Sequence, residues 1–302
     1  MHRLILVPAV VALTLAACTD GEPALARGDR LWADSSFPAA LAEYRLGLAQ
    51  NPDDEEALAR VAHAYAVTGQ FERAREHYDR LIAEDDSWTD QAVFDYLDLA
   101  ERARQRSDRY GMAGAVEAAL ALRPGLPVDA MAPALARYYA STGEPERALD
   151  FYERALTTSP ADSVPDLLYE IGEVYVARSD CREAIGYFNA YLTRAPRSDR
   201  SDQARWHVGN CSFTLATRAR REGDEQEALR RLETTISLGL PVNLLDQAWF
   251  ERGEALLALG RRAEALESFY EVLRLNPSRT GQLVDRARTR IDQIRFGIFD
   301  RR

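Results

Sequence analysis

Residues 249–277 read WFERGEALLALGRRAEALESFYEVLRLNP, and this stretch decides the fold. In it, the small residue Gly253 stands twelve positions before Ala265, and the aromatic Phe269 follows that alanine by four. The same spacing returns four more times, in the triplets Gly28/Ala40/Tyr44, Ala62/Ala74/Tyr78, Ala136/Ala148/Tyr152 and Gly172/Ala184/Phe188. A segment that returns at such intervals predicts a protein built from stacked repeats.

Each repeat is predicted to hold two helices, because apolar or small residues recur at helical spacing, as at Leu168, Ile171 and Tyr175. Glycines at 69, 143 and 260 mark the ends of first helices, where the chain turns left-handed. Prolines end the second helices, at positions 52, 124, 160, 196, 241 and 277. The pattern places repeats at 21–54, 55–88, 93–126, 129–162, 165–198, 202–242 and 246–279.

The order of residue types in the last repeat resembles the tetratricopeptide repeat family. The residues that carry the resemblance are Trp249, Gly253, Leu256, Ala265, Phe269 and Pro277. The resemblance implies an all-α fold, a right-handed superhelical solenoid of about seven helix pairs over residues 24–279. A capping helix and tail are expected in residues 280–302, because Val284, Ala287, Ile291 and Ile294 share one face.

Two repeats depart from the pattern. The third, around Tyr96, Leu99, Ala100, Met112 and Val116, keeps little of it apart from Pro124. In the sixth, Gly209 and Ala228 lie nineteen residues apart instead of twelve, which adds about two helical turns. We expect both helices of this repeat to run long and residues 214–222 to protrude.

Three arginines in the protruding part of the sixth repeat, Arg218, Arg220 and Arg221, form a local basic patch on an acidic chain. The patch is either a solvated helix face or a contact for anionic lipid or an acidic partner.

The N-terminus predicts export and a lipid anchor. Residues 4–17 form an apolar run of fourteen after a short basic start, which is too short to span a bilayer and fits a secretory signal at 1–17. The run ends in Leu15-Ala16-Ala17-Cys18, which resembles the bacterial lipobox. That resemblance implies lipidation of Cys18, with 18–23 as anchor and short linker, on the periplasmic face of the bacterial envelope. Thr19 rather than aspartate follows the cysteine, which favours the outer membrane in proteobacteria-like sorting. The alternative is a plain signal peptide with a chance cysteine.

Of the other two cysteines, Cys181 opens the second helix of the fifth repeat, and Cys211 lies late in the first helix of the sixth. These helices are neighbours in an antiparallel stack, so both cysteines fall towards the same end of the stack. In an oxidising compartment they are therefore expected to form a disulfide. Two buried free thiols, or a metal site completed by His207, are the alternatives.

Composition argues against nucleic acid as a partner, because the formal net charge is −10. All 38 basic residues are arginine.

The sequence carries no phosphate-binding loop, nucleophile elbow, zinc-protease or dinucleotide motif. We therefore predict no enzyme activity, no catalytic residue, no metal and no cofactor.

Binding positions follow from the resemblance, since partners of tetratricopeptide arrays commonly occupy the groove lined by first helices. The first groove position falls on Tyr169, Trp206 and Phe250. The other groove positions are Glu173, Asn210, Glu254, Phe213 and Leu257. Such an aromatic ladder could hold a peptide, or the rings could instead pack against neighbouring helices.

The segment from Ser201 to Cys211 also resembles periplasmic tetratricopeptide proteins of envelope assembly, including the lipoprotein of the outer-membrane β-barrel assembly machinery. That family has five repeats where this chain has about seven. These features together predict a lipid-anchored periplasmic scaffold that binds protein or peptide partners in cell-envelope assembly or maintenance. The alternative is an accessory subunit that presents peptide or glycan to a cell-wall enzyme.

Overall fold

The computed structural model describes residues 22–276, 278 and 280–297, so Cys18 and the predicted signal segment lie outside the described residues. Within these residues the chain forms fifteen α-helices and four short 3-10 helices, and no strand. The expectation of an all-α repeat fold that ends in a further helix is confirmed. No helix in this part of the chain is both long and apolar enough to cross a membrane.

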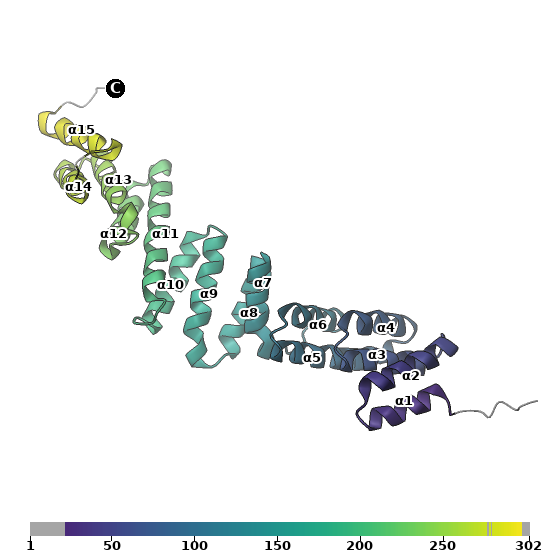
Figure 1. Ribbon diagram of the computed structural model, residues 1–302. Helices are drawn as coiled ribbons and strands as arrows, with labels where there is room; N and C mark the ends of the chain where they lie inside the picture. Colours follow the sequence, from purple (N-terminus) through teal and green to yellow (C-terminus); the bar gives the residue numbers. More distant parts are fainter. Residues whose placement is uncertain (1–21, 277, 279, 298–302) are drawn as a thin grey trace, which may run out of the picture. The chain divides into compact units, whose positions relative to one another are not determined.

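The chain divides into two compact units, the first ending at Leu126 and the second beginning at Pro127. The first unit holds three antiparallel helix pairs (Figure 1). Their helices are α1 (Ala24–Ala33), α2 (Phe37–Gln50), α3 (Glu55–Val67), α4 (Phe71–Glu84), α5 (Thr89–Gln105) and α6 (Arg109–Leu122), with η1 (Asp86–Trp88) before α5. The degenerate third repeat is therefore helical, and its first helix begins four residues before the predicted start.

The second unit holds four helix pairs and a final helix (Figure 1). Its α-helices are α7 (Ala132–Thr142), α8 (Pro145–Thr158), α9 (Val164–Ala177), α10 (Cys181–Arg194), α11 (Ser201–Glu222), α12 (Glu225–Leu238), α13 (Leu245–Ala258), α14 (Arg262–Leu275) and α15 (Gln282–Phe296). Short helices η2 (Asp129–Met131), η3 (Ala161–Ser163) and η4 (Val242–Leu244) precede α7, α9 and α13.

The repeated small residues let the two helices of a pair approach closely. A Cβ atom added at Gly172 would lie 2.8 Å from the Phe188 ring, and one added at Gly253 would lie 2.6 Å from the Phe269 ring. Both rings are fully buried. The repeating glycine and aromatic are thus packing partners, as the spacing predicted.

The sixth repeat is lengthened in only one of its two helices. Helix α11 has 22 residues and ends at Gly223, which takes a left-handed conformation with φ of 82°. Helix α12 has 14 residues, the length of most second helices in the chain, so the expectation that both helices run long is wrong. All of the extra length lies at the C-terminal end of α11.

The final helix closes the last pair of the second unit. Val284, Ala287 and Ile291 of α15 are buried, and α15 packs on α14. This agrees with the expected capping helix, since the end of a solenoid needs a helix with one apolar and one polar face.

Candidate functional site

The two cysteines of the second unit meet between α10 and α11. Cys181 is the first residue of α10 and Cys211 lies halfway along α11, which packs beside it. The structure joins them in a disulfide with the Cα atoms 4.9 Å apart, within the usual range for such a bond. Both side chains are buried, so the pair ties the fifth repeat to the lengthened sixth.

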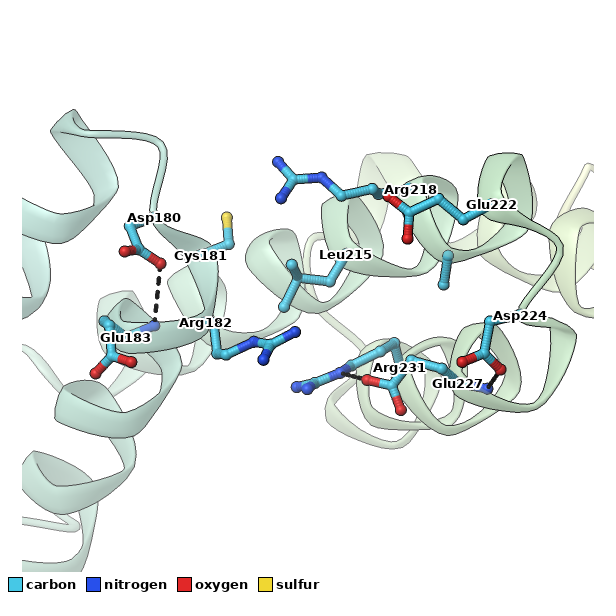
Figure 2. Close-up of a pocket in the computed structure, with 11 residues that line it drawn as sticks. Asp180, Cys181, Arg182, Glu183, Leu215, Arg218, Glu222, Asp224, Glu227 and Arg231 are labelled. Carbon is cyan, nitrogen blue, oxygen red and sulfur yellow. Dashed lines mark hydrogen bonds and ion pairs between the residues drawn. The ribbon is translucent and has the colours of Figure 1, made fainter.

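Beside this disulfide the long end of α11 creates an open cleft of about 640 Å³. The extra turns of α11 and the first turns of α12 reach past the start of α10, and the cleft lies between these three segments (Figure 2). We call it the α10–α12 cleft. Its lining residues are Asp180, Cys181, Arg182, Glu183, Leu215, Arg218, Ala219, Glu222, Asp224, Glu227 and Arg231.

Most acidic groups of the cleft already have partners. Asp180 accepts a hydrogen bond from the backbone N–H of Glu183 at the start of α10, and Asp224 accepts one from Glu227 at the start of α12, at 2.9 Å. The Glu227 carboxylate accepts a hydrogen bond from Nε of Arg231 at 2.6 Å. Arg231, followed by Arg230, holds the pKa of Glu227 below its usual value.

Three arginines line the cleft. Arg231 pairs with Glu227, whereas Arg182 and Arg218 form no ion pair with any described residue. Figure 2 shows the guanidinium group of Arg182, on α10, pointing toward that of Arg231, on α12. The α10–α12 cleft is therefore lined by charges of both signs, three arginines and five carboxylates.

The predicted basic patch on α11 does not form as a unit. Arg220 is only 23% exposed and its side chain pairs with Glu225, at 3.3 Å, and with Glu251. Arg218 instead faces the α10–α12 cleft, and Arg221 is exposed outside it.

The predicted aromatic groove is mostly core. The Tyr169 ring is 2% exposed and lies edge-on to Phe188 and Tyr191, at 5.5 and 5.2 Å between ring centroids. The Arg200 guanidinium covers it, 5.1 Å from the ring centroid. Burial raises the pKa of Tyr169 to about 12. The Tyr169 ring therefore packs against neighbouring helices, which was the alternative to a role in peptide binding.

The far end of the predicted groove is covered by α15. The Phe250 ring is 1% exposed, packs edge-on to Phe269 and lies under Arg286 at 4.3 Å. Glu254 accepts a hydrogen bond from Arg290 at 2.6 Å. Both predicted groove positions, Phe250 and Glu254, therefore contact other residues of the same protein.

The remaining groove positions differ in exposure. Phe213 is buried, and Leu257 packs against the core of the last repeat. Trp206 is 40% exposed and stands edge-on to His207, with Asn210 half-buried one turn further along α11. Glu173 is exposed at the surface, but partial desolvation by neighbouring residues raises the pKa of its carboxyl group.

The first unit holds a buried carboxylate that the sequence did not reveal. Asp95 of α5 is 3% exposed and lies 2.7 Å from Nδ1 of His63, and its other oxygen accepts from Gln91 at 3.0 Å. The Tyr78 hydroxyl donates to the same Asp95 oxygen that lies near His63. Asp95 is therefore held inside the fold and not on a solvated helix face.

A repeated tyrosine in the sequence could have indicated the contact between Tyr78 and Asp95. The aromatic of the second helix is a tyrosine in the first, second and fourth repeats, and each hydroxyl donates to a carboxylate on a neighbouring first helix. The three pairs are Tyr44–Asp29, Tyr78–Asp95 and Tyr152–Glu170.

Family models agree with this geometry. Three models, each described as tetratricopeptide repeat, match residues 31–93, 134–164 and 213–280. Together they cover more than half of the 302 residues and fall in both units.

Solved structures show the same kind of helical repeat. YrrB, described as a TPR protein with an unusual peptide-binding site, is 20% identical, with 72% of this chain and 100% of that chain covered and a TM-score of 0.34. A tetratricopeptide repeat protein from Parabacteroides merdae is 11% identical, with 90% and 97% covered and a TM-score of 0.32. PilW, described as a type IV pilus biogenesis factor, is 13% identical, with 87% and 96% covered and a TM-score of 0.31.

These scores are too low to carry an argument about function. No curated protein matches the chain. The identification therefore depends on the family models and on the helix pairs themselves. The chain belongs to the tetratricopeptide-repeat proteins, with repeats of this kind in both of its units.

Proposed function

We propose that this protein is a lipid-anchored periplasmic scaffold that binds a protein or peptide partner in the assembly or maintenance of a bacterial cell envelope. Tetratricopeptide repeats mediate protein–protein interaction, and stacked helix pairs offer extended surfaces for it.

The different environments of the three cysteines carry the proposal. Cys181 and Cys211 are paired and buried in the second unit, and such pairs persist in oxidising compartments such as the periplasm. Cys18 follows an apolar run of fourteen residues and a lipobox-like triplet. A disulfide between two cysteines, with a third cysteine at the lipid-acceptor position, fits an exported lipoprotein.

The anchor would hold the first repeat near the membrane. Five residues separate Cys18 from Ala24, where α1 begins, and a fully extended segment of that length spans at most about 17 Å. Thr19 rather than aspartate follows the cysteine, which favours the outer membrane. The β-barrel assembly machinery is one envelope system in which such a protein would act.

The accessory-subunit alternative has less support. It depended on an aromatic-lined groove that could hold glycan or peptide, and two of the three ladder rings, Tyr169 and Phe250, are buried. Only Trp206 of that ladder is exposed. The scaffold is therefore the function that the geometry supports better.

The test compares the wild-type protein with Cys18→Ser in cells fed a clickable palmitate analogue. We expect label on the wild type alone, with the wild type in the outer-membrane fraction and reached by protease only after the outer membrane is opened. Absence of label from the wild type, or protection from protease after opening, would contradict the proposed anchor and compartment.

Partner binding is tested by purifying the tagged protein from detergent-solubilised envelope. We expect an envelope protein to co-purify in a fixed ratio, whereas binding to isolated peptidoglycan alone would support the accessory role instead.

A further inference from the structure

We propose that the contact between His63 and Asp95 makes the packing of the second repeat on the third sensitive to pH, and that this packing is tighter when His63 carries a proton. The inference goes beyond the proposed function and depends on neither the anchor nor the partner.

Three contacts between the first helices of neighbouring repeats share one arrangement. In each, a carboxylate that accepts a hydrogen bond from the tyrosine of a second helix also faces a basic side chain across the two first helices. The three sets are Tyr44–Asp29–Arg60, Tyr78–Asp95–His63 and Tyr152–Glu170–Arg137. Arginine supplies the basic group in two of these sets and histidine in the third.

His63 and Arg137 occupy the same position of their repeats. Each directly follows the small residue that begins the repeated triplet, Ala62 in the second repeat and Ala136 in the fourth. An arginine keeps its charge at every pH that proteins normally meet, whereas a histidine gains and loses its proton near neutral pH. The second repeat therefore carries a titrating group where the fourth carries a permanent charge.

The carboxylate that faces the histidine is the most buried of the three. The Asp95 side chain is 3% exposed, against 18% for Glu170 and 48% for Asp29. Among the described residues His63 is the only basic side chain bonded to Asp95, because Tyr78 and Gln91 are neutral donors. A hydrogen bond between two charged groups is stronger than one with a neutral partner, so proton loss from His63 weakens the contact.

The charges on the α1 and α3 side of His63 neutralise one another. The Trp32 ring of α1 lies 5.0 Å from the imidazole, between ring centroids. Arg60 lies one turn earlier on α3 and pairs with Asp29 of α1 and with Glu56. Arg60 therefore does not supply the missing charge to Asp95.

The groups on the α4 and α5 side leave the titration to the histidine. Burial, followed by the charge of Asp95, raises the pKa of Tyr78 far above its usual value, so its hydroxyl stays a neutral donor. Asp98, one turn after Asp95 on α5, pairs with Arg102 at 2.7 Å. Near neutral pH the charge of the contact therefore changes at His63.

The sign of the effect follows from the ion pair. Separating α3 from α5 breaks the contact between the imidazolium and the carboxylate, so the protonated form favours the packed state. The added stability is full below the ordinary pKa of a histidine, about 6.5, and is lost as pH rises above that value.

The test is hydrogen–deuterium exchange with mass spectrometry on the mature full-length protein in detergent. Exchange is measured at pH about 5.5 and about 8, on either side of the range in which a histidine titrates, and each rate is divided by the intrinsic rate at that pH. We expect the protection of amides in α3 and α5 to be at least about fivefold greater at the lower pH. Helices α7 and α9, joined by Arg137 and Glu170, should show no such rise.

Three variants make the test specific to this contact. H63R places a permanent charge beside Asp95 and H63Q a neutral donor, so in both the rise should shrink to less than about twofold. H77Q is the matched control, because His77 belongs to the same unit and forms no ion pair with a described residue. It should keep the full rise.

Equal rises in the wild type, H63R and H63Q would overturn the proposal. So would a wild type in which α3 and α5 gain no protection at the lower pH. This second comparison needs no variant, so it decides the question even if circular dichroism shows that a substitution at His63 prevents folding.

Discussion

Gly209 of α11 is the position where one added methyl group should damage the fold most clearly. A Cβ atom there would lie 2.0 Å from the backbone carbonyl oxygen of Leu240 and 2.9 Å from its carbon. At Gly172 the obstacle is the Phe188 ring, a side chain that can move. A backbone carbonyl can move only if the α12–α13 connection shifts with it. We therefore predict that Gly209→Ala destabilises the second unit strongly.

The magnitude follows from the contacts. Ordinary van der Waals contact begins near 3.4 Å, so the connection must retreat by more than an ångström. Overpacking of this kind costs about 1–3 kcal/mol, and more when the backbone moves. The Thr235 hydroxyl donates to the Gly209 carbonyl at 2.9 Å, and disturbing that bond adds about 1 kcal/mol. The expected loss in the free energy of unfolding is about 3 kcal/mol.

Gly186 of α10 supplies the matched control. It lies in a helix interior of the same unit, and a Cβ atom added there meets nothing within 4 Å. Gly186→Ala should therefore gain about 0.5–1 kcal/mol, because alanine loses less backbone entropy than glycine in a helix.

The assay is thermal unfolding followed by circular dichroism at 222 nm. For a unit of this size, about 1 kcal/mol shifts Tm by about 2–4 °C, so Gly209→Ala should lower Tm by about 6–12 °C. Gly186→Ala should raise it by about 1–4 °C. A Tm for Gly209→Ala within about 2 °C of the wild type would refute the close approach of α11 to Leu240.

Three further predictions concern the disulfide, the groove and the half-buried His207. Unfolded, non-reduced mature protein should show no reactive thiol from Cys181 or Cys211 with Ellman's reagent, and two reactive thiols would contradict the pairing. Tyr169→Ala should cost about 3–5 kcal/mol in urea unfolding, whereas Trp206→Ala should cost less than about 1 kcal/mol; equal costs would show that Tyr169 is not core. Burial lowers the pKa of His207, so its neutral form stabilises the fold above pH about 6.5, and that contribution is lost as pH falls below this value. His207→Gln should therefore reduce the loss of stability between pH 7 and 5, and an unchanged pH profile would sink this assignment.

The helix pairs could be predicted from sequence because their determinants are local and repeated. Gly253 and Phe269 are sixteen residues apart, and the same pairing recurs at Gly172 and Phe188. Each pair needs only the two helices of one repeat to meet. The lengthened sixth repeat was also visible, as an altered spacing between Gly209 and Ala228.

The binding surfaces could not be read in the same way, because their exposure depends on other elements. Whether Tyr169 faces a groove or the core is decided by Arg200 and Tyr191, and for Phe250 by α15. The α10–α12 cleft exists because the extra turns of α11 extend at one end only, which the spacing alone does not specify. Asp95 is buried because residues from three helices surround it.

The most direct measurement for the account is co-purification from solubilised envelope, quantified by mass spectrometry and repeated with the two purified proteins. We predict that an envelope protein binds the wild type in a fixed ratio. Recovery of no envelope protein above the untagged background by the wild type would contradict the central claim that this protein is a partner-binding scaffold.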